Sequence, residues 1–345
     1  MRVASCLFLT GAVGVAACSR LAPAQAPSAG APSSGVAATE PLLTPLPRVA
    51  SPGAVPQPAQ VVRFGRRPVR VGDVAVQNVQ VGLELTTRYT QSGQIANEGQ
   101  ATMQRQQRRR IETLAVEGDR LSEARLTFEL SRNQSPENPD PAALVVQPVE
   151  GKTYFVSRRG EEVRITDASG SIPPLDEFKL VSDVAENIGK PNPLAKLLLE
   201  RPIAVGERLL VSREIAATLL GLRDQVGTVK RFELTLERLE PTPLLAPRAS
   251  AEPPSDVAVF AARIETLPND ATPMELTLTG QVKIEVDTCR AVAAEFDGPV
   301  QMSTIERTRA DVFQFSAAGK LSLAIRSDYD YLGAERLARR GAPLR

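Results

Sequence analysis

The stretch Met274-Glu-Leu-Thr-Leu-Thr-Gly-Gln-Val-Lys-Ile-Glu-Val-Asp287 decides the fold of this chain. Its apolar residues recur at every second position, and polar residues fill most of the positions between them. A period of two is typical of a β-strand with one buried face. Gly280 interrupts the apolar series, and a glycine inside a long strand indicates a bend or bulge that curls the sheet.

The same alternation continues on both sides of this stretch. After a turn at residues 287–290, a second long strand is predicted from Val292 to Thr304, and an earlier one from Val79 to Tyr89. Long strands joined by tight turns predict an antiparallel meander. Further strands are predicted at residues 100–117, 121–130, 153–156, 163–166, 229–239, 257–266, 312–317 and 321–325.

Between these groups of strands the apolar period changes to three and four residues. Helices are predicted over residues 175–189, from Pro193 after the N-cap Asn192, and from Ser212 to a stop at Gly221. We therefore expect an α+β fold that is mostly β: a large curved antiparallel sheet, half-barrel-like, with two or three short helices inserted mid-chain. This single domain spans residues 61–332, the helical insertion spans 173–222, and a basic disordered tail follows at 333–345.

The amino terminus has the anatomy of an export signal. Met1-Arg2 precedes an apolar run that ends at Ala17 and is too short to span a membrane. Val15-Ala16-Ala17-Cys18 resembles the lipobox of bacterial lipoproteins, which implies that residues 1–17 are a lipoprotein signal peptide and that Cys18 carries lipid. The alternative is ordinary cleavage after Ala26, which would release a soluble protein. Residues 18–60 are rich in Pro, Ala and Ser, and we expect a disordered tether.

The lipobox resemblance implies an exported protein whose lipid on Cys18 anchors it in the membrane of the cell envelope. Ser19, in place of an aspartate, implies the outer membrane, with the domain facing the periplasm. The predicted core resembles the half-barrel of bacterial lipoprotein carriers and of mycobacterial glycolipid carriers, in which a curved sheet wraps a hydrophobic cavity under a helical lid. Gly151-Lys152-Thr153-Tyr154-Phe155 and Val205-Gly206-Glu207 are similar to segments of uncharacterised bacterial lipoproteins.

The composition excludes several classes of protein. The chain has no histidine, so it cannot build a Ser-His-Asp or Cys-His catalytic group or a zinc site based on imidazole. With 41 Lys and Arg against 40 Asp and Glu, its net charge of +1 argues against binding nucleic acid. After signal cleavage, Cys289 is the one cysteine left without lipid. It is either a reactive or intermolecularly bonded thiol or a small residue that fills a turn, and we favour the turn. We expect no enzymatic activity, no cofactor and no metal.

The run Gln104-Arg-Gln-Gln-Arg-Arg-Arg110 lies within a predicted strand. It has two interpretations. Its arginines could meet anionic lipid headgroups near a membrane, or they could form a solvated face that also protects a sheet edge.

Two functions remain open at this stage. The first is a non-catalytic envelope lipoprotein that binds a lipid or another hydrophobic ligand between the curved sheet and the helices. The alternative is a structural or interaction lipoprotein with no small-molecule ligand and an unknown protein partner. For the first function, the candidate lining consists of Phe178, Val181, Ile188, Leu276, Leu278, Ile284, Phe296 and Met302.

Overall fold

The computed structural model describes residues 60–134, 143–220, 228–241, 256–268, 274–307 and 311–331. The predicted signal peptide with Cys18, nearly all of the predicted tether and the predicted basic tail lie outside the described residues. The strands and helices of the described part lie between Val61 and Asp330. A chain that begins at Ser19 therefore keeps the whole described fold.

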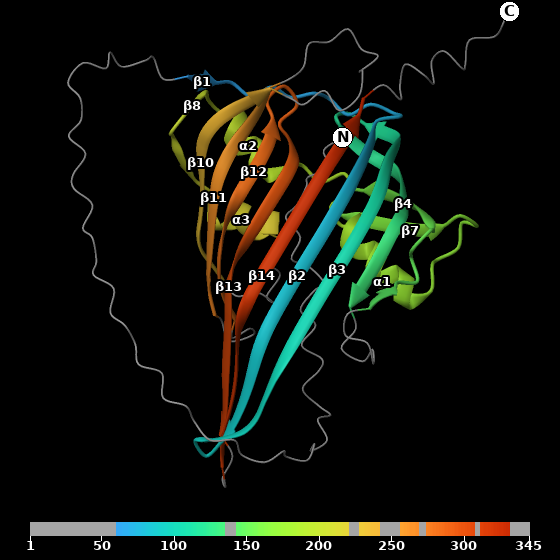
Figure 1. Ribbon diagram of the computed structural model, residues 1–345. Helices are drawn as coiled ribbons and strands as arrows, with labels where there is room; N and C mark the ends of the chain where they lie inside the picture. The colour runs from blue at the N-terminus through green and yellow to red at the C-terminus, as the bar shows by residue number, and fades with distance from the viewer. Residues whose placement is uncertain are drawn as a thin grey trace, which may run out of the picture. The chain divides into compact units, whose positions relative to one another are not determined.

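Most of the described chain forms one 12-stranded antiparallel sheet, which does not close into a barrel (Figure 1). Its strands run in the order β7-β6-β4-β3-β2-β14-β13-β12-β11-β10-β9, and β5 pairs with β4 beside this path. The bounds are β2 Val74–Gln91, β3 Gln94–Glu117, β4 Arg120–Gln134, β5 Leu144–Val146, β6 Thr153–Arg159, β7 Glu162–Asp167, β9 Arg208–Leu210, β10 Thr228–Pro241, β11 Asp256–Leu267, β12 Met274–Glu285, β13 Arg290–Arg307 and β14 Val312–Asp330. β1 (Val61–Val62) and β8 (Ile203–Ala204) form a separate pair.

The large antiparallel sheet with mid-chain helices, predicted from the alternation, is confirmed. The centre of the sheet joins β2 to β14, so that the early and late strands of the domain meet there. Residues 312–317 and 321–325, predicted as two strands, belong to the single strand β14. Gly319 does not end that strand because it stays paired with Leu85 on one side and Val300 on the other.

Three glycines lie on one diagonal of the concave face and allow the sheet to curl. Gly280, Gly298 and Gly319 occupy positions where the alternation would place an inward side chain, on β12, β13 and β14. A Cβ at each of them would overlap a backbone carbonyl oxygen of the neighbouring strand, that of Glu295, Thr277 or Glu84 respectively. Adjacent backbones approach this closely only where the side chain is absent.

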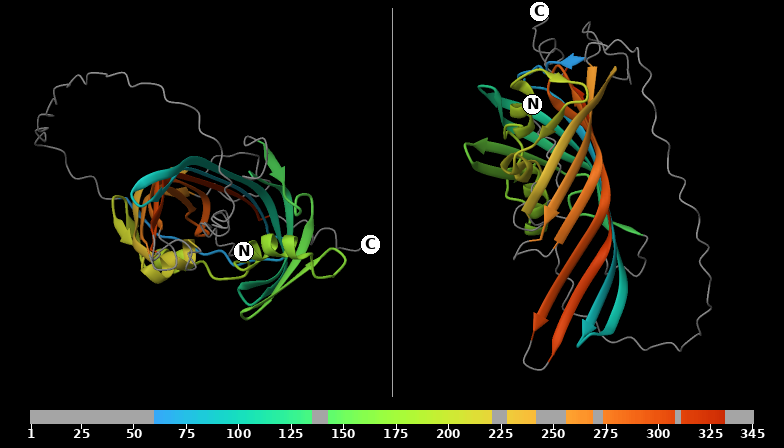
Figure 2. Two further views of the ribbon diagram at one scale, coloured as in Figure 1. Left: turned by 90° about the horizontal axis from the view of Figure 1, so that it is seen from below. Right: turned by 90° about the vertical axis from the view of Figure 1, so that its left-hand side faces the viewer.

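The described residues form three helices, α1 (Leu175–Ala185), α2 (Pro193–Leu199) and α3 (Arg213–Leu220), on one side of the sheet (Figure 2). α2 begins as predicted, and Asn192 Oδ1 accepts a hydrogen bond of 3.0 Å from the Leu194 amide. α1 ends at Ala185 rather than at residue 189. α1 packs on β7 and α3 on β10, so these two helices lie over opposite flanks of the sheet.

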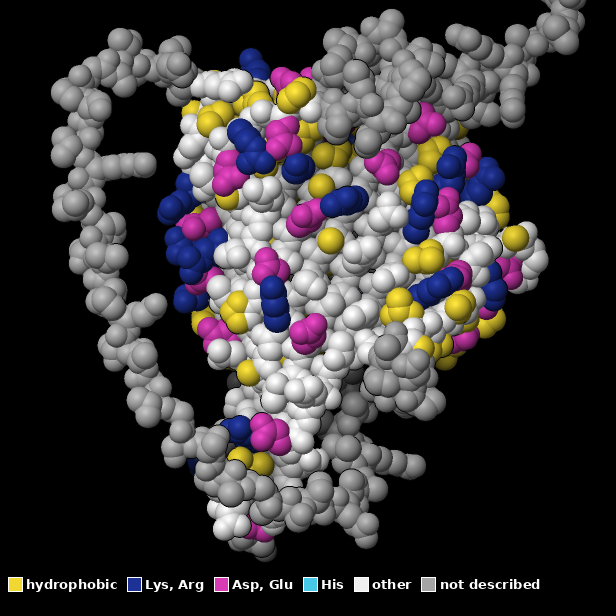
Figure 3. All heavy atoms as spheres, viewed as in Figure 1, with side chains coloured by type: hydrophobic (Ala, Val, Ile, Leu, Met, Phe, Trp, Pro, Cys, Tyr) yellow, Lys and Arg dark blue, Asp and Glu magenta, His cyan; other side chains and the backbone are white. Residues whose placement is uncertain are grey.

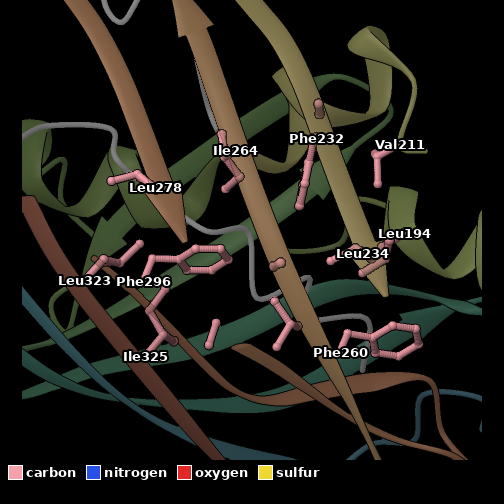
Figure 4. Packing of buried hydrophobic residues seen from close by; sticks show 14 of the residues in the cluster. Leu194, Val211, Phe232, Leu234, Phe260, Ile264, Leu278, Phe296, Leu323 and Ile325 are labelled. Carbon is pink, nitrogen blue, oxygen red and sulfur yellow. The ribbon is translucent and has the colours of Figure 1, made fainter. Parts of the chain in front are cut away.

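The buried apolar side chains form two clusters. The larger one joins β9 to β14 and β2 with α2 and α3, and Figure 4 shows part of it, including Phe232, Phe260 and Phe296. The smaller one joins β2, β3, β4, β6 and β7 with α1. In the smaller cluster, the rings of Phe128 and Tyr154 meet edge to face with their centroids 6.0 Å apart.

A candidate ligand surface on the concave face

The candidate lining residues fall into both clusters rather than around one space. Leu276, Leu278, Ile284 and Phe296 are buried on the concave face in the larger cluster. Phe178, Val181 and Ile188, from α1 and the turn after it, pack in or against the smaller cluster. Met302 is buried on β13 and belongs to neither cluster. The structure therefore brings the other seven residues together in two groups.

A buried polar belt lies between the two clusters on the concave face. Arg109 Nε donates to Gln77 Oε1 at 2.9 Å, and Gln77 Nε2 donates to Ser327 Oγ at 3.5 Å. Gln107 Nε2 donates to Ser131 Oγ at 3.2 Å. These side chains satisfy one another, which is the condition for burying polar groups without a large loss of stability.

The basic run does not lie at a sheet edge, which corrects that part of the interpretation, and only its alternate residues form a solvated face. Its strand, β3, lies inside the sheet between β2 and β4. Alternation sends Arg108 and Arg110 to the exposed convex face, while Gln107 and Arg109 are buried on the concave face. The sequence could not separate the two sets because polar residues occupy both faces of this part of the strand.

Arg105 differs from the other concave side chains of the belt. Its side chain is partly buried, and its Nε is fully buried without a hydrogen-bond partner among the described residues. No described ion pair joins its guanidinium to a carboxylate within 4.0 Å. Burial lowers the pKa of Arg105 from its ordinary value, and the charge of Asp183 on α1 partly opposes this shift.

An apolar track continues from the larger cluster along the concave face, past the helices. It consists of Leu85, Tyr89, Met103, Met302, Phe313 and Phe315, from the four neighbouring strands β3, β2, β14 and β13. Leu85, Met103, Phe313 and Phe315 are only partly buried, and Tyr89 is 38% exposed. The rings of Tyr89 and Phe313 stack with their centroids 5.9 Å apart. These four strands project well beyond the helices in both views (Figures 1 and 2).

The flank of the concave face under α1 is fixed by buried charged groups. The carboxylate of Glu177 accepts hydrogen bonds of 2.6 Å from Lys152 Nζ and from Tyr154 Oη. The hydrogen bonds from these two groups hold the pKa of Glu177 below its ordinary value. Burial, together with Glu177, raises the pKa of Tyr154 above its ordinary range, so its hydroxyl remains a donor.

The side chain of Arg158 caps the C-terminal end of helix α1, a role that was not predicted from the sequence. Its Nε donates to the carbonyl of Ile188 at 2.6 Å, and one terminal nitrogen donates to the carbonyls of Glu186 at 2.6 Å and Ala185 at 3.3 Å. Carbonyls at a helix end have no partner within the helix, and this guanidinium satisfies several of them. Arg158 therefore has a structural role.

A second group of buried charges ties the start of the domain to its end. Arg67 donates to both carboxylate oxygens of Asp73, at 3.2 and 3.1 Å, and lies over the ring of Tyr331. Arg290 lies beside the rings of Tyr329 and Tyr331, with its guanidinium 3.9 Å from Asp73. Both arginines lie against tyrosine rings and share the carboxylate of Asp73, which favours a structural role.

The hollows on the convex face are open, and their walls combine polar and apolar groups. One of about 790 Å³ has Gln104, Gln281 and Lys320 in its wall, and one of about 460 Å³ has Arg88 and Glu98. Figure 3 views the sheet from this side, opposite the helices, and shows charged side chains scattered among uncharged polar ones. Several are paired, as Lys320 is with Asp297 at 2.9 Å. Neither hollow is enclosed, and both have charged side chains in their walls.

Cys289, Asp and Glu do not gather into a metal site in the described chain, where no group of three or more such side chains is placed to hold an ion. Cys289 is buried in the turn between β12 and β13, with a positive φ of 54°. Over the residues that the structure describes, no helix is both long and apolar enough to cross a membrane.

The fold and surface define an open, strongly curved antiparallel sheet with helices over its concave side. No family model matches the chain, and no curated protein matches it. Among solved structures, one described as "Lipid-protein interactions in lipovitellin" is similar over 74% of this chain and 26% of its own, with a TM-score of 0.31 and 9% identity. The chain thus spans about a quarter of that structure's length. Likeness at this level does not establish a common function.

Proposed function

We propose that this protein is a non-catalytic, membrane-anchored lipoprotein of the cell envelope that binds the acyl chain of a lipid on its concave face. The apolar track carries the proposal. Leu85, Met103, Phe313 and Phe315 lie on one face of three paired strands, and they remain partly exposed on strands that project beyond the helices.

The shape of the track favours a linear apolar ligand. It runs along the strands, and its side chains are aliphatic, thioether or aromatic groups that adapt to a flexible chain. Burial of one methylene group contributes about 0.8 kcal/mol. A chain of ten or so methylene groups on this track therefore gains enough free energy to offset the cost of ordering it.

The anchor proposal rests on the lipobox and on the prolines that follow it. A lipid on Cys18 would hold the domain at the outer membrane, and residues 18–60 would give it reach into the periplasm. Growth of the producing cells with an alkyne-tagged fatty acid should label the full chain. The variant Cys18→Ser should remain unlabelled and should no longer be processed at this site.

Native mass spectrometry, followed by organic extraction, tests ligand binding. The chain beginning at Ser19, produced in a bacterial periplasm and purified without detergent, should retain one acyl lipid in a non-covalent complex. Phe315→Glu places a charge on the track and should abolish retention. Gln314→Glu adds the same charge to the exposed convex face of the same strand and should leave retention unchanged.

An unliganded mass for the wild-type chain that also takes up no added lipid would contradict the proposal. In that case, crosslinking in intact cells that captures a stoichiometric protein would support the alternative, an interaction lipoprotein. Equal loss of lipid from both glutamate variants would also contradict a ligand on the concave face.

A further inference from the structure

We propose that Arg105 binds the headgroup of the ligand, so that the ligand is an anionic amphiphile whose carboxylate or phosphate lies at the inner end of the apolar track. This inference rests on the acyl-binding function proposed above and adds the chemical class of the ligand. It assigns to one residue of the basic run a role that the other arginines of that run cannot perform.

The position of Arg105 is the first argument. It follows Met103 on the concave side of β3, so it lies where the track ends and the polar belt begins. The register places Val81 of β2 beside it on one side and Asn133 of β4 on the other. An amphiphile needs this order of surfaces, an apolar strip followed by a polar group of opposite charge.

The missing partner is the second argument. A buried guanidinium nitrogen without a hydrogen bond costs free energy, and native proteins rarely leave one in that state without a functional reason. Other buried arginines have partners: Arg109 donates to Gln77, and Arg158 donates to helix carbonyls. Within the described chain, Arg290 also has buried nitrogens without a hydrogen bond, but its guanidinium lies over two tyrosine rings and beside a carboxylate. Arg105 has no such bond from its buried Nε among the described residues.

The electrostatic setting is the third argument. The charge of Asp183 on α1 opposes the lowering of the Arg105 pKa by burial, and the described side chains form no hydrogen bond or salt bridge between the two groups. Asp183 therefore leaves the donors of the guanidinium available. Arginine presents these donors as a planar fork that fits a carboxylate or phosphate, and such charge-assisted bonds are stronger than neutral ones.

The test compares three probes that share a dodecyl chain: laurate, dodecyl phosphate and the neutral 1-dodecanol. Their displacement of the neutral dye Nile red from the chain beginning at Ser19 gives their relative affinities. We expect both anions to bind about tenfold or more tightly than dodecanol, because the charged hydrogen bond is added to the same apolar contact. The ratio of laurate to dodecyl phosphate then identifies a carboxylate or a phosphate headgroup.

Arg105→Met replaces the guanidinium by an apolar side chain and should remove this preference without weakening the binding of dodecanol. The same change should raise the midpoint of thermal unfolding of the ligand-free chain, because a buried unpartnered polar group is removed. Arg110→Met on the exposed face of the same strand is the control and should leave both the preference and the midpoint unchanged. Arg105→Lys should keep a reduced preference for anions and provides the comparison if the methionine variant does not fold.

Each outcome separates the two proposals. If dodecanol binds as tightly as the anions and Arg105→Met or Arg105→Lys changes nothing, the headgroup inference is wrong while acyl binding stands. If none of the three probes displaces Nile red, both proposals fail.

Discussion

At the scale of single residues, the buried charges show what alternation cannot reveal. Arg105 and Arg108 are the same amino acid in the same strand, but one faces the apolar track and the other pairs with Glu129 on the exposed face at 2.7 Å. Alternation places them on opposite faces, but which of the two polar faces is buried depends on the packing of β3 between β2 and β4, which the local sequence does not encode. The bond from Arg158 to the end of α1 is hidden for the same reason, since it joins segments that are distant in the chain.

The hydrogen bonds of Glu177 make stability depend on pH. Its lowered pKa means that the folded state favours the carboxylate, so its contribution is complete above the ordinary value of 4.5 and is lost as pH falls through the lowered folded pKa. Glu177→Gln should reduce the free energy of unfolding by roughly 1–3 kcal/mol at pH 7. Denaturant titrations at pH 7 and at decreasing pH should show this difference shrinking toward acid.

Glu161→Gln, in the exposed turn between β6 and β7, is the matched control and should change stability little at any pH. A constant deficit for Glu177→Gln across the acid range would contradict the assignment, because it would show that the charge of the carboxylate is not what stabilises the fold.

At the scale of elements, the strands were predicted from the sequence and their arrangement was not. Alternation located the long strands because one face of each is buried, and Asn192-Pro193 located α2 because a cap and a proline are local signals. The division of the candidate lining residues between two clusters is determined by tertiary packing. Phe178 and Phe296 follow equally apolar patterns, and only the position of α1 over β7 separates them.

The diagonal of glycines is the element-scale feature with the clearest mechanical role. Gly280→Ala should lower the free energy of unfolding by roughly 1–3 kcal/mol, because its Cβ would meet the carbonyl of Glu295 and force the two strands apart. Gly298→Ala and Gly319→Ala should behave in the same way. Chemical denaturation of the purified variants measures the effect.

Gly99→Ala tests whether replacing any strand glycine lowers the free energy of unfolding as much as replacing one on the diagonal. A Cβ at Gly99 would lie 3.4 Å from Thr87 Oγ1, an ordinary contact, so this change should be neutral or slightly stabilising. A Gly99→Ala deficit as large as that of Gly280→Ala would indicate a general cost of losing glycine and would contradict the role of the diagonal in the curl.

At the scale of the whole molecule, the polar belt divides the interior into two apolar regions under one continuous sheet. Phe128 lies in the smaller region and Phe260 in the larger one, and they share no ring contact. Phe128→Leu and Phe260→Leu should each lower the free energy of unfolding by roughly 1–3 kcal/mol. In the double variant these losses should add to within about 0.5 kcal/mol, as equilibrium denaturation can show.

The pair Phe64 and Phe260 provides the comparison within one region, because their rings stack with centroids 6.1 Å apart. Replacing both by leucine should give a clearly non-additive loss. If Phe128 and Phe260 were coupled as strongly as this stacked pair, the interior would act as one packed core and the belt would not separate it.

The pairing of β2 with β14 also determines the order in which the molecule can be completed as it is synthesised. β2 is made early and β14 is the last described strand, so the middle of the sheet stays unfilled until almost the whole chain is available. Until then, β2 and β13 each present a long unpaired edge, the kind of edge through which nascent chains pair with one another. During biosynthesis the growing chain is therefore open to pairing with other chains until β14 has been made.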